Sequence, residues 1–186
     1  MRIKSKWGKG KEHKERSIED QASAVAFIVW RIAQDALLNL ENDDYQTDSL
    51  KQRMDVVVEF VIFLTHLADR YSYENMSAAE REQFVVGIVM NLARNYQGSM
   101  EDIEGIQEHK KDFIDLVNER MADYSEMPFD GEDPSFMMRR YLGSRVQQVM
   151  GERHNKWIET QVLEINAPEA IDNLKRAMEN LLKPGF

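Results

Sequence analysis

The sequence predicts a soluble, single-domain, all-α protein, and three observations support this prediction. Apolar residues recur at intervals of three and four, the period of a helix, and strand-like alternation never lasts longer than a few residues. The four prolines and nine glycines lie mostly between the periodic segments. A chain of 186 residues suits one domain that buries roughly 70% of its unfolded surface, which needs no disulfide or metal to hold it together.

The first half of the chain predicts an arm and two long helices. Residues 1–16 are rich in lysine and are expected to be a flexible basic arm, so that the helical domain spans residues 17–186. A first helix is expected from Ser17 to about residue 40, with an acid three residues after the serine as in a weak capping box. A second helix is expected over residues 48–73, and its apolar middle predicts the central buried helix of the fold. The valines at 56–58 are β-branched, but the length and polar face of the segment favour a helix.

Two further helices are expected in the middle of the chain. The third begins at Ser77, where a glutamate three residues later completes a capping box. It is expected to end near Tyr96, with Gly98 as its C-terminal stop. The fourth is expected after Ser99 and continues to about Tyr124, with an apolar stripe along it.

A loop and a fifth helix follow. Residues 127–133 contain proline, aspartate and glycine, and they predict the clearest loop of the chain. Asp133 followed by Pro134 is typical of an N-cap and a first-turn proline. The fifth helix is expected to reach Gly151 and, bent or broken there, to continue towards Ile165.

Asn166 and Pro168 predict the start of a last helix that ends before Pro184. The connections between the six expected helices are short. Short connections favour antiparallel neighbours, so we expect an antiparallel helical bundle.

The charge of −9 is unevenly distributed. Residues 1–16 carry seven basic and two acidic side chains, a net charge of +5, and the remaining residues therefore carry −14. An acidic body repels nucleic acid and anionic membrane surfaces, so only the arm is a candidate for such contacts. Trp7 could then stack on a base, although a solvated tail without a specific role is the simpler interpretation.

The absence of cysteine excludes a disulfide scaffold, thiolate zinc sites, iron–sulfur clusters and cysteine nucleophiles. It is compatible with a reducing compartment, and we expect a cytoplasmic protein. No apolar run reaches the ~18 uncharged residues of a spanning helix, and the longest, Val56 to Leu64, is interrupted by Glu59.

The polar face of the second helix carries the candidate ligand-binding residues. Asp55, Glu59 and His66 share this face, and Glu59 lies among apolar residues that would raise its pKa. Such a face can line a ligand cavity, or it can simply meet solvent. Arg31 and Arg94 lie near apolar runs and are candidate buried partners of Glu59, although Arg31 can also reach the surface.

No metal or cofactor is expected. A di-iron bundle site needs a glutamate three residues before a histidine, and none of the four histidines has one. Glu101 and Glu104 form an acid pair, but the nearest second pair at this spacing is 65 residues away. The acidic series around them is interpreted as a solvated helix face.

A cluster of large side chains predicts an interface. The chain has eleven methionines, and methionine-rich surfaces can adapt to varied partners. Phe136, Met137 and Met138 are consecutive and cannot all face one direction, so at least one is expected at the surface, with Tyr141 nearby. The alternative is that the whole cluster belongs to the core.

The sequence therefore predicts a non-enzymatic interaction or regulatory protein that self-associates, most simply as a homodimer, or binds another protein. The rival hypothesis is a helical enzyme or small-ligand binder that uses Glu59, His66 and Asp55 in a cavity between helices. A third is nucleic-acid contact through residues 1–16.

Overall fold

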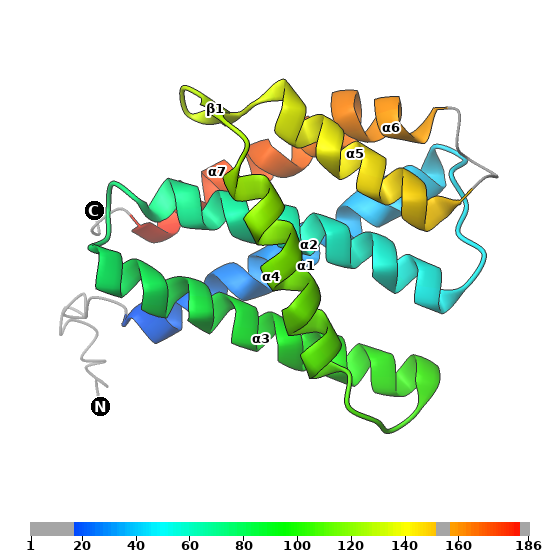
Figure 1. The fold of residues 1–186 in the computed structure, drawn as a ribbon, viewed down its shortest axis with the longest axis horizontal. Helices are drawn as coiled ribbons and strands as arrows, with labels where there is room; N and C mark the ends of the chain where they lie inside the picture. Colours follow the sequence, from blue (N-terminus) through cyan, green and yellow to red (C-terminus); the bar gives the residue numbers. More distant parts are fainter. Residues whose placement is uncertain (1–16, 152–156, 183–186) are drawn as a thin grey trace, which may run out of the picture.

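Six continuous helical segments and one small hairpin make up the described part of the chain, residues 17–151 and 157–182 of a computed structural model (Figure 1). The first five helices are α1 (Ile18–Asn42), α2 (Leu50–Ser72), α3 (Ala78–Glu104), α4 (Lys110–Ser125) and α5 (Phe136–Met150). The sixth segment consists of α6 (Ile158–Gln161), the π-helical turn η2 (Val162–Asn166) and α7 (Ala167–Leu182). Strands β1 (Phe129–Asp130) and β2 (Asp133–Pro134) pair antiparallel between α4 and α5. The predicted all-α bundle of about six helices is confirmed.

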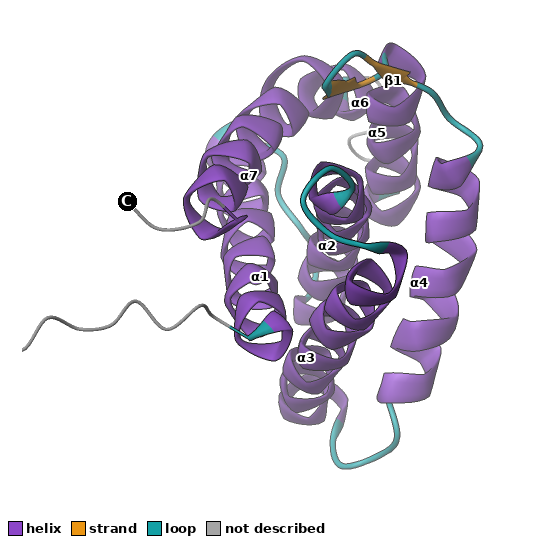
Figure 2. Ribbon diagram, turned by 90° about the vertical axis from the view of Figure 1, so that its left-hand side faces the viewer, coloured by secondary structure: helices purple, strands orange, loops and turns teal. Residues whose placement is uncertain are grey.

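The α2 helix is the centre of the fold. It contacts α1, α3, α4, α5 and α7, and Figure 2 shows it end-on with these helices around it. Every residue from Val56 to Ala68 is buried, so the valine run lies in a helix that is covered on all sides. The chain reverses direction from α1 to α2 and again to α3, whereas α4 crosses α3 steeply (Figure 1).

The α1 helix is long and apolar enough to span a membrane by length and composition alone. In this fold its apolar side packs against α2, α3 and α7. Half of its most apolar window is buried inside the protein. The arm, residues 1–16, lies outside the described residues.

Two of the predicted helix starts are confirmed at atomic detail. The Ser17 hydroxyl accepts a hydrogen bond from the Asp20 amide at 3.1 Å. Ser77 and Glu80 form a reciprocal capping box at the start of α3, in which the glutamate accepts from the Ser77 amide at 2.9 Å.

The boundary between α3 and α4 differs from the prediction. The α3 helix continues through Gly98 and Ser99 to Glu104 and ends at Gly105, whose φ of 90° lies in the region that favours glycine. A glycine inside a helix costs about 1 kcal/mol, but it does not end the helix when the turns before and after it pack against other helices. The acid pair Glu101 and Glu104 therefore belongs to the end of α3.

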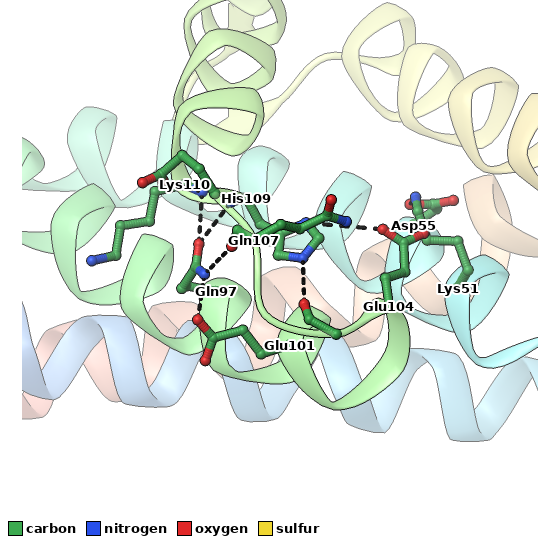
Figure 3. A network of polar contacts seen from close by, with 10 residues as sticks. Lys51, Asp55, Gln97, Glu101, Glu104, Gln107, His109 and Lys110 are labelled. Atoms are coloured by element: carbon green, nitrogen blue, oxygen red, sulfur yellow. Dashed lines mark hydrogen bonds and ion pairs between the residues drawn. The ribbon is translucent and has the colours of Figure 1, made fainter.

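The start of α4 is capped from another helix (Figure 3). The Gln97 side-chain oxygen accepts hydrogen bonds from the amides of His109 at 2.8 Å and Lys110 at 3.0 Å. Its nitrogen donates to the Gln107 carbonyl at 2.7 Å and to Glu101. The Gln97 side chain on α3 thus holds the loop and the first turn of α4, whose N-cap residue His109 makes no capping bond, while Glu108 also accepts from the Lys110 amide at 3.0 Å.

The C-terminal third contains two further corrections. Asp133 and Pro134 form β2, and the N-cap of α5 is Ser135, which accepts from the Met138 amide at 3.3 Å. Asn166 does not begin a helix, because α6, η2 and α7 are continuous. Pro168 is accommodated directly after the π-helical turn, where the wider backbone relieves the clash of the proline ring with the preceding turn.

Candidate functional site

Glu59 lies inside the bundle and faces two arginines. Its carboxylate is 3% exposed, and Oε1 is 3.5 Å from Arg120 Nε on α4 and 3.9 Å from Arg145 Nε on α5. Neither Arg31 nor Arg94 is its partner. Glu59, Arg120 and Arg145, together with Tyr124, are called the buried ionic cluster below.

The cluster is largely buried, and several of its polar atoms lack a hydrogen-bond partner among the described residues. Burial raises the pKa of Glu59, and the positive charges of Arg120 and Arg145 pull in the opposite direction without cancelling it. The Tyr124 hydroxyl is fully buried and has no hydrogen-bond partner among the described residues, and burial followed by the charge of Glu59 holds its pKa well above the usual value. This arrangement ties α2, α4 and α5 together in the interior of the bundle.

A series of rings leads from the cluster towards one end of the bundle. Tyr124 packs edge-on against Tyr141 at 5.1 Å and stacks on His66 at 5.6 Å between ring centroids. His66 lies 6.4 Å from Phe129 of the hairpin, which meets Tyr71 edge-on at 6.3 Å. Burial, assisted by the charge of Arg70, lowers the pKa of His66 to about 4, so the imidazole is neutral near pH 7.

The last two rings of this series line a pocket. Its volume is about 770 Å³, and it lies between the C-terminal end of α2, the hairpin and the last turns of α7. We call it the end pocket. Its lining residues are Arg70, Tyr71, Tyr73, Glu74, Asn75, Phe129, Gly131, Glu132, Lys175, Met178 and Glu179.

Each aromatic ring of the end pocket has a cation of the protein against it. The guanidinium of Arg70 lies 4.7 Å from the Phe129 centroid, and Lys175 Nζ lies 5.7 Å from that of Tyr71. Arg81, from the start of α3, lies 5.1 Å from the Tyr73 centroid. These contacts hold rings from separate elements in place, since each cation is attracted to a ring face.

Carboxylates outnumber cations around the end pocket. Three glutamates and two cations line it, and Asp133 forms an ion pair with Lys175. Burial raises the pKa of Tyr71 well above its usual value, and the charges of Asp133, Asp172 and Glu132 raise it further. The Tyr71 hydroxyl is buried without a hydrogen-bond partner in the described structure. The pocket therefore combines apolar surface with a negative potential.

The residues expected to form a ligand site on α2 have different surroundings. Glu59 and His66 are both buried: Glu59 belongs to the buried ionic cluster, and His66 stacks on Tyr124. Neither side chain lines the end pocket. Asp55 is half-buried and pairs with Lys51 one turn away. The structure thus does not bring the three carboxylate and imidazole groups to one cavity.

The two arginines expected near Glu59 lie at the surface. Arg31 is exposed and extends over the Phe27 ring, 5.9 Å from its centroid. Arg94 is exposed and donates to the Asn91 side chain at 3.1 Å. Both arginines point outwards, because other residues of α1 and α3 form the contacts with the neighbouring helices.

The residues expected at an interface are divided between surface and interior. Phe136 and Met137 are 53% and 62% exposed. Met138 is fully buried and unavailable to a partner, and Tyr141 is half-buried with its hydroxyl donating to Asp123. At least one of the three consecutive residues is exposed, as the pattern predicted.

Arg120 and Arg145 were missed, although the sequence carries a signal for both. Arg120 follows Val117 by three residues and precedes Tyr124 by four, which places it on the apolar stripe of α4. Arg145 follows Leu142 by three residues in the same way. The end pocket had no such signal, because its lining residues come from three segments far apart in the chain.

Residues 17–151 and 157–182 contain no group of three or more histidine, aspartate or glutamate side chains placed to hold a metal ion. Searches against family models, curated proteins and solved structures gave no match for this chain.

Proposed function

We propose that this protein is a non-enzymatic interaction protein that binds a basic, partly apolar polypeptide segment in the end pocket. The observation that carries the proposal is the pocket itself, about 770 Å³ in volume, lined by aromatic rings and an excess of carboxylates. This volume lies within the roughly 300–1,000 Å³ typical of ligand pockets.

The lining favours a ligand with two kinds of group. Tyr71, Phe129 and Met178 offer apolar surface for a ring or an alkyl chain. Glu74 and Glu132 are exposed at the pocket and suit a lysine or arginine side chain. An anionic ligand is disfavoured, because residues 17–186 carry −14.

A short basic peptide tests this proposal. We expect a fluorescein-labelled Lys-Trp-Lys peptide to bind the full-length protein, measured as a rise in fluorescence anisotropy. Replacing both carboxylates, Glu74→Gln with Glu132→Gln, is expected to weaken binding by about twofold to thirtyfold, since each exposed ion pair contributes about 0.2–1 kcal/mol.

The matched control is Glu82→Gln, an exposed carboxylate on α3 that does not line the pocket. It removes a charge but leaves the pocket intact. Binding that weakens equally in Glu82→Gln and in the double variant would show only nonspecific attraction and contradict the proposal.

A second candidate function is self-association through the first turn of α5. Phe136 and Met137 are adjacent and more than half exposed, and large exposed apolar side chains are enriched at protein interfaces. Sedimentation of wild type, Phe136→Glu and Met137→Glu tests it, with a shift towards monomer expected in both variants. A wild-type protein that stays monomeric at high concentration would rule this interface out.

A further inference from the structure

The start of α1 lies at the same end of the bundle as the end pocket. Figure 2 views this end directly, with the first turn of α1, the connection from α2 to α3 and the last turns of α7 all facing the viewer. Ser17, the N-cap of α1, therefore lies at the same end of the bundle as the elements that line the pocket, and residues 1–16 precede it in the chain.

We propose that residues 1–16 of the same chain occupy the end pocket, with Trp7 among its rings and the neighbouring lysines at Glu74 and Glu132. This proposal rests on the proposed function and names the segment that the pocket takes. The arm would then act as a built-in competitor for any external basic segment.

The charges of the two parts are complementary. The arm carries a net +5, and Lys6 and Lys9 lie on either side of its only tryptophan. The pocket presents Glu74 and Glu132 without an ion pair of their own in the described structure, beside aromatic surface that suits an indole. An arm of this composition contains both kinds of group that the pocket lining favours.

The arm is also long enough. Trp7 lies ten positions before Ser17, and at about 3.3 Å per position this stretch can span up to roughly 33 Å. The α1 helix, with 25 residues, is about 37 Å long. The reach of Trp7 is therefore close to the length of the bundle, whereas the pocket lies at the near end.

Attachment to the same chain strengthens such binding. A segment on a short flexible tether has an effective concentration of about a millimolar at a site within its reach. A dissociation constant below about a millimolar then leaves the pocket mostly occupied, and an external ligand must displace the arm. Screening at about 8 Å in physiological salt confines the attraction to residues that reach the pocket itself.

The absence of cysteine from the chain permits a site-specific test in the full-length protein. Asn75 is exposed and lines the pocket, so Asn75→Cys can carry a bimane label, whose fluorescence tryptophan quenches on close approach. We expect the label to be quenched when residue 7 is tryptophan and the quenching to be lost in Trp7→Phe. An unchanged signal in Trp7→Phe would overturn the proposal.

The matched control places the same label at Asp102→Cys, an exposed position near the C-terminal end of α3. Trp7→Phe is expected to leave this signal unchanged. Equal loss of quenching at both positions would mean that the arm has no preferred site and would also overturn the proposal.

Mixing distinguishes the same chain from a second copy. Labelled Asn75→Cys carrying Trp7→Phe is combined with an excess of unlabelled wild type, and we expect no quenching to appear. Quenching that grows with the wild-type concentration would assign the arm to a second copy and contradict occupancy by the same chain. If the arm fails both tests while Lys-Trp-Lys binds in a manner that depends on Glu74 and Glu132, the proposed function stands without this inference.

Discussion

The Glu59 carboxylate on α2 and the Arg120 guanidinium on α4 form an ion pair in the interior, with Oε1 and Nε 3.5 Å apart and both side chains buried. Removing two charges from water costs several kcal/mol per ion, and the long contacts of Glu59 with Arg120 and Arg145 do not return that energy, although Arg120 also pairs with Glu119. The role of the pair is therefore to position α4 rather than to stabilise the fold. It fixes the position of α4 against α2 and the rotation of α4 about its own axis. The α4 helix crosses the bundle steeply and leads into the hairpin of the end pocket.

Removing one member of this pair is expected to be strongly destabilising. Arg120→Met leaves Glu59 buried with only the more distant Arg145 beside it. We expect a loss of about 3–5 kcal/mol in the free energy of unfolding, measured by urea denaturation. The double variant Glu59→Leu with Arg120→Met removes both charges and is expected to recover most of that loss. A single variant as stable as wild type would contradict the account.

His66 is expected to make stability depend on pH. Its pKa falls from 6.5 when unfolded to about 4 in the fold. The stabilisation is therefore fully present above pH 6.5 and is lost as the pH falls through 4, because the unfolded chain binds the proton more readily. A shift of this size corresponds to at most about 3 kcal/mol.

The variant His66→Phe isolates this effect, since phenylalanine can keep the ring contact with Tyr124. The stability of wild type and variant is measured between pH 7 and pH 4. We expect the difference between the two curves to change across this window, with the variant losing less stability on acidification. Parallel curves would show that His66 does not titrate as its burial implies.

Two glycines in helices are expected to respond oppositely to alanine. A Cβ on Gly143 would lie 2.8 Å from the Glu159 carbonyl oxygen, where α5 meets α6. Gly143→Ala should lower the free energy of unfolding by about 1–3 kcal/mol, because backbone must shift. Gly98→Ala meets no heavy atom within 4 Å and should raise it by up to about 1 kcal/mol. Thermal unfolding measures both, and a destabilised Gly98→Ala would indicate that α3 is interrupted there.

Gln97 is expected to matter more for α4 than the serine at position 99. Gln97→Ala removes the acceptor of the His109 amide and one of the two acceptors of the Lys110 amide, the other being Glu108, and should cost about 1–2 kcal/mol in the free energy of unfolding. Ser99→Ala changes a side chain in the continuous part of α3 and should leave stability within about 0.5 kcal/mol of wild type. Urea denaturation compares the two, and equal effects would argue against capping by Gln97.

The sequence by itself determined the fold class and most helix positions. Helical periodicity and the capping serines at 17 and 77 are local signals. They can be recognised in one sequence because they depend only on residues a few positions apart. The same signals placed the most apolar segment, around Val56 to Leu67, at the centre of the bundle.

Local signals failed where a distant residue decided the outcome. Gly98 and Ser99 resemble a helix end followed by a cap, but α3 continues because its neighbours pack along it, and Gln97 caps α4 from another helix. Pro168 resembles a helix start, yet a π-helical turn admits it into a continuous segment. Such choices depend on packing that no stretch of ten residues contains.

The buried ionic cluster and the end pocket also differ in how much of each the sequence predicts. Periodicity and composition identified Glu59 as a carboxylate in an apolar setting, and they carried an unused signal for Arg120 and Arg145. Only the tertiary structure decided that Glu59 faces these two arginines, and only it assembled Tyr71, Phe129 and Lys175 into one pocket. The reason is physical: helix faces follow from a local repeat, whereas partners across helices follow from how the whole core packs.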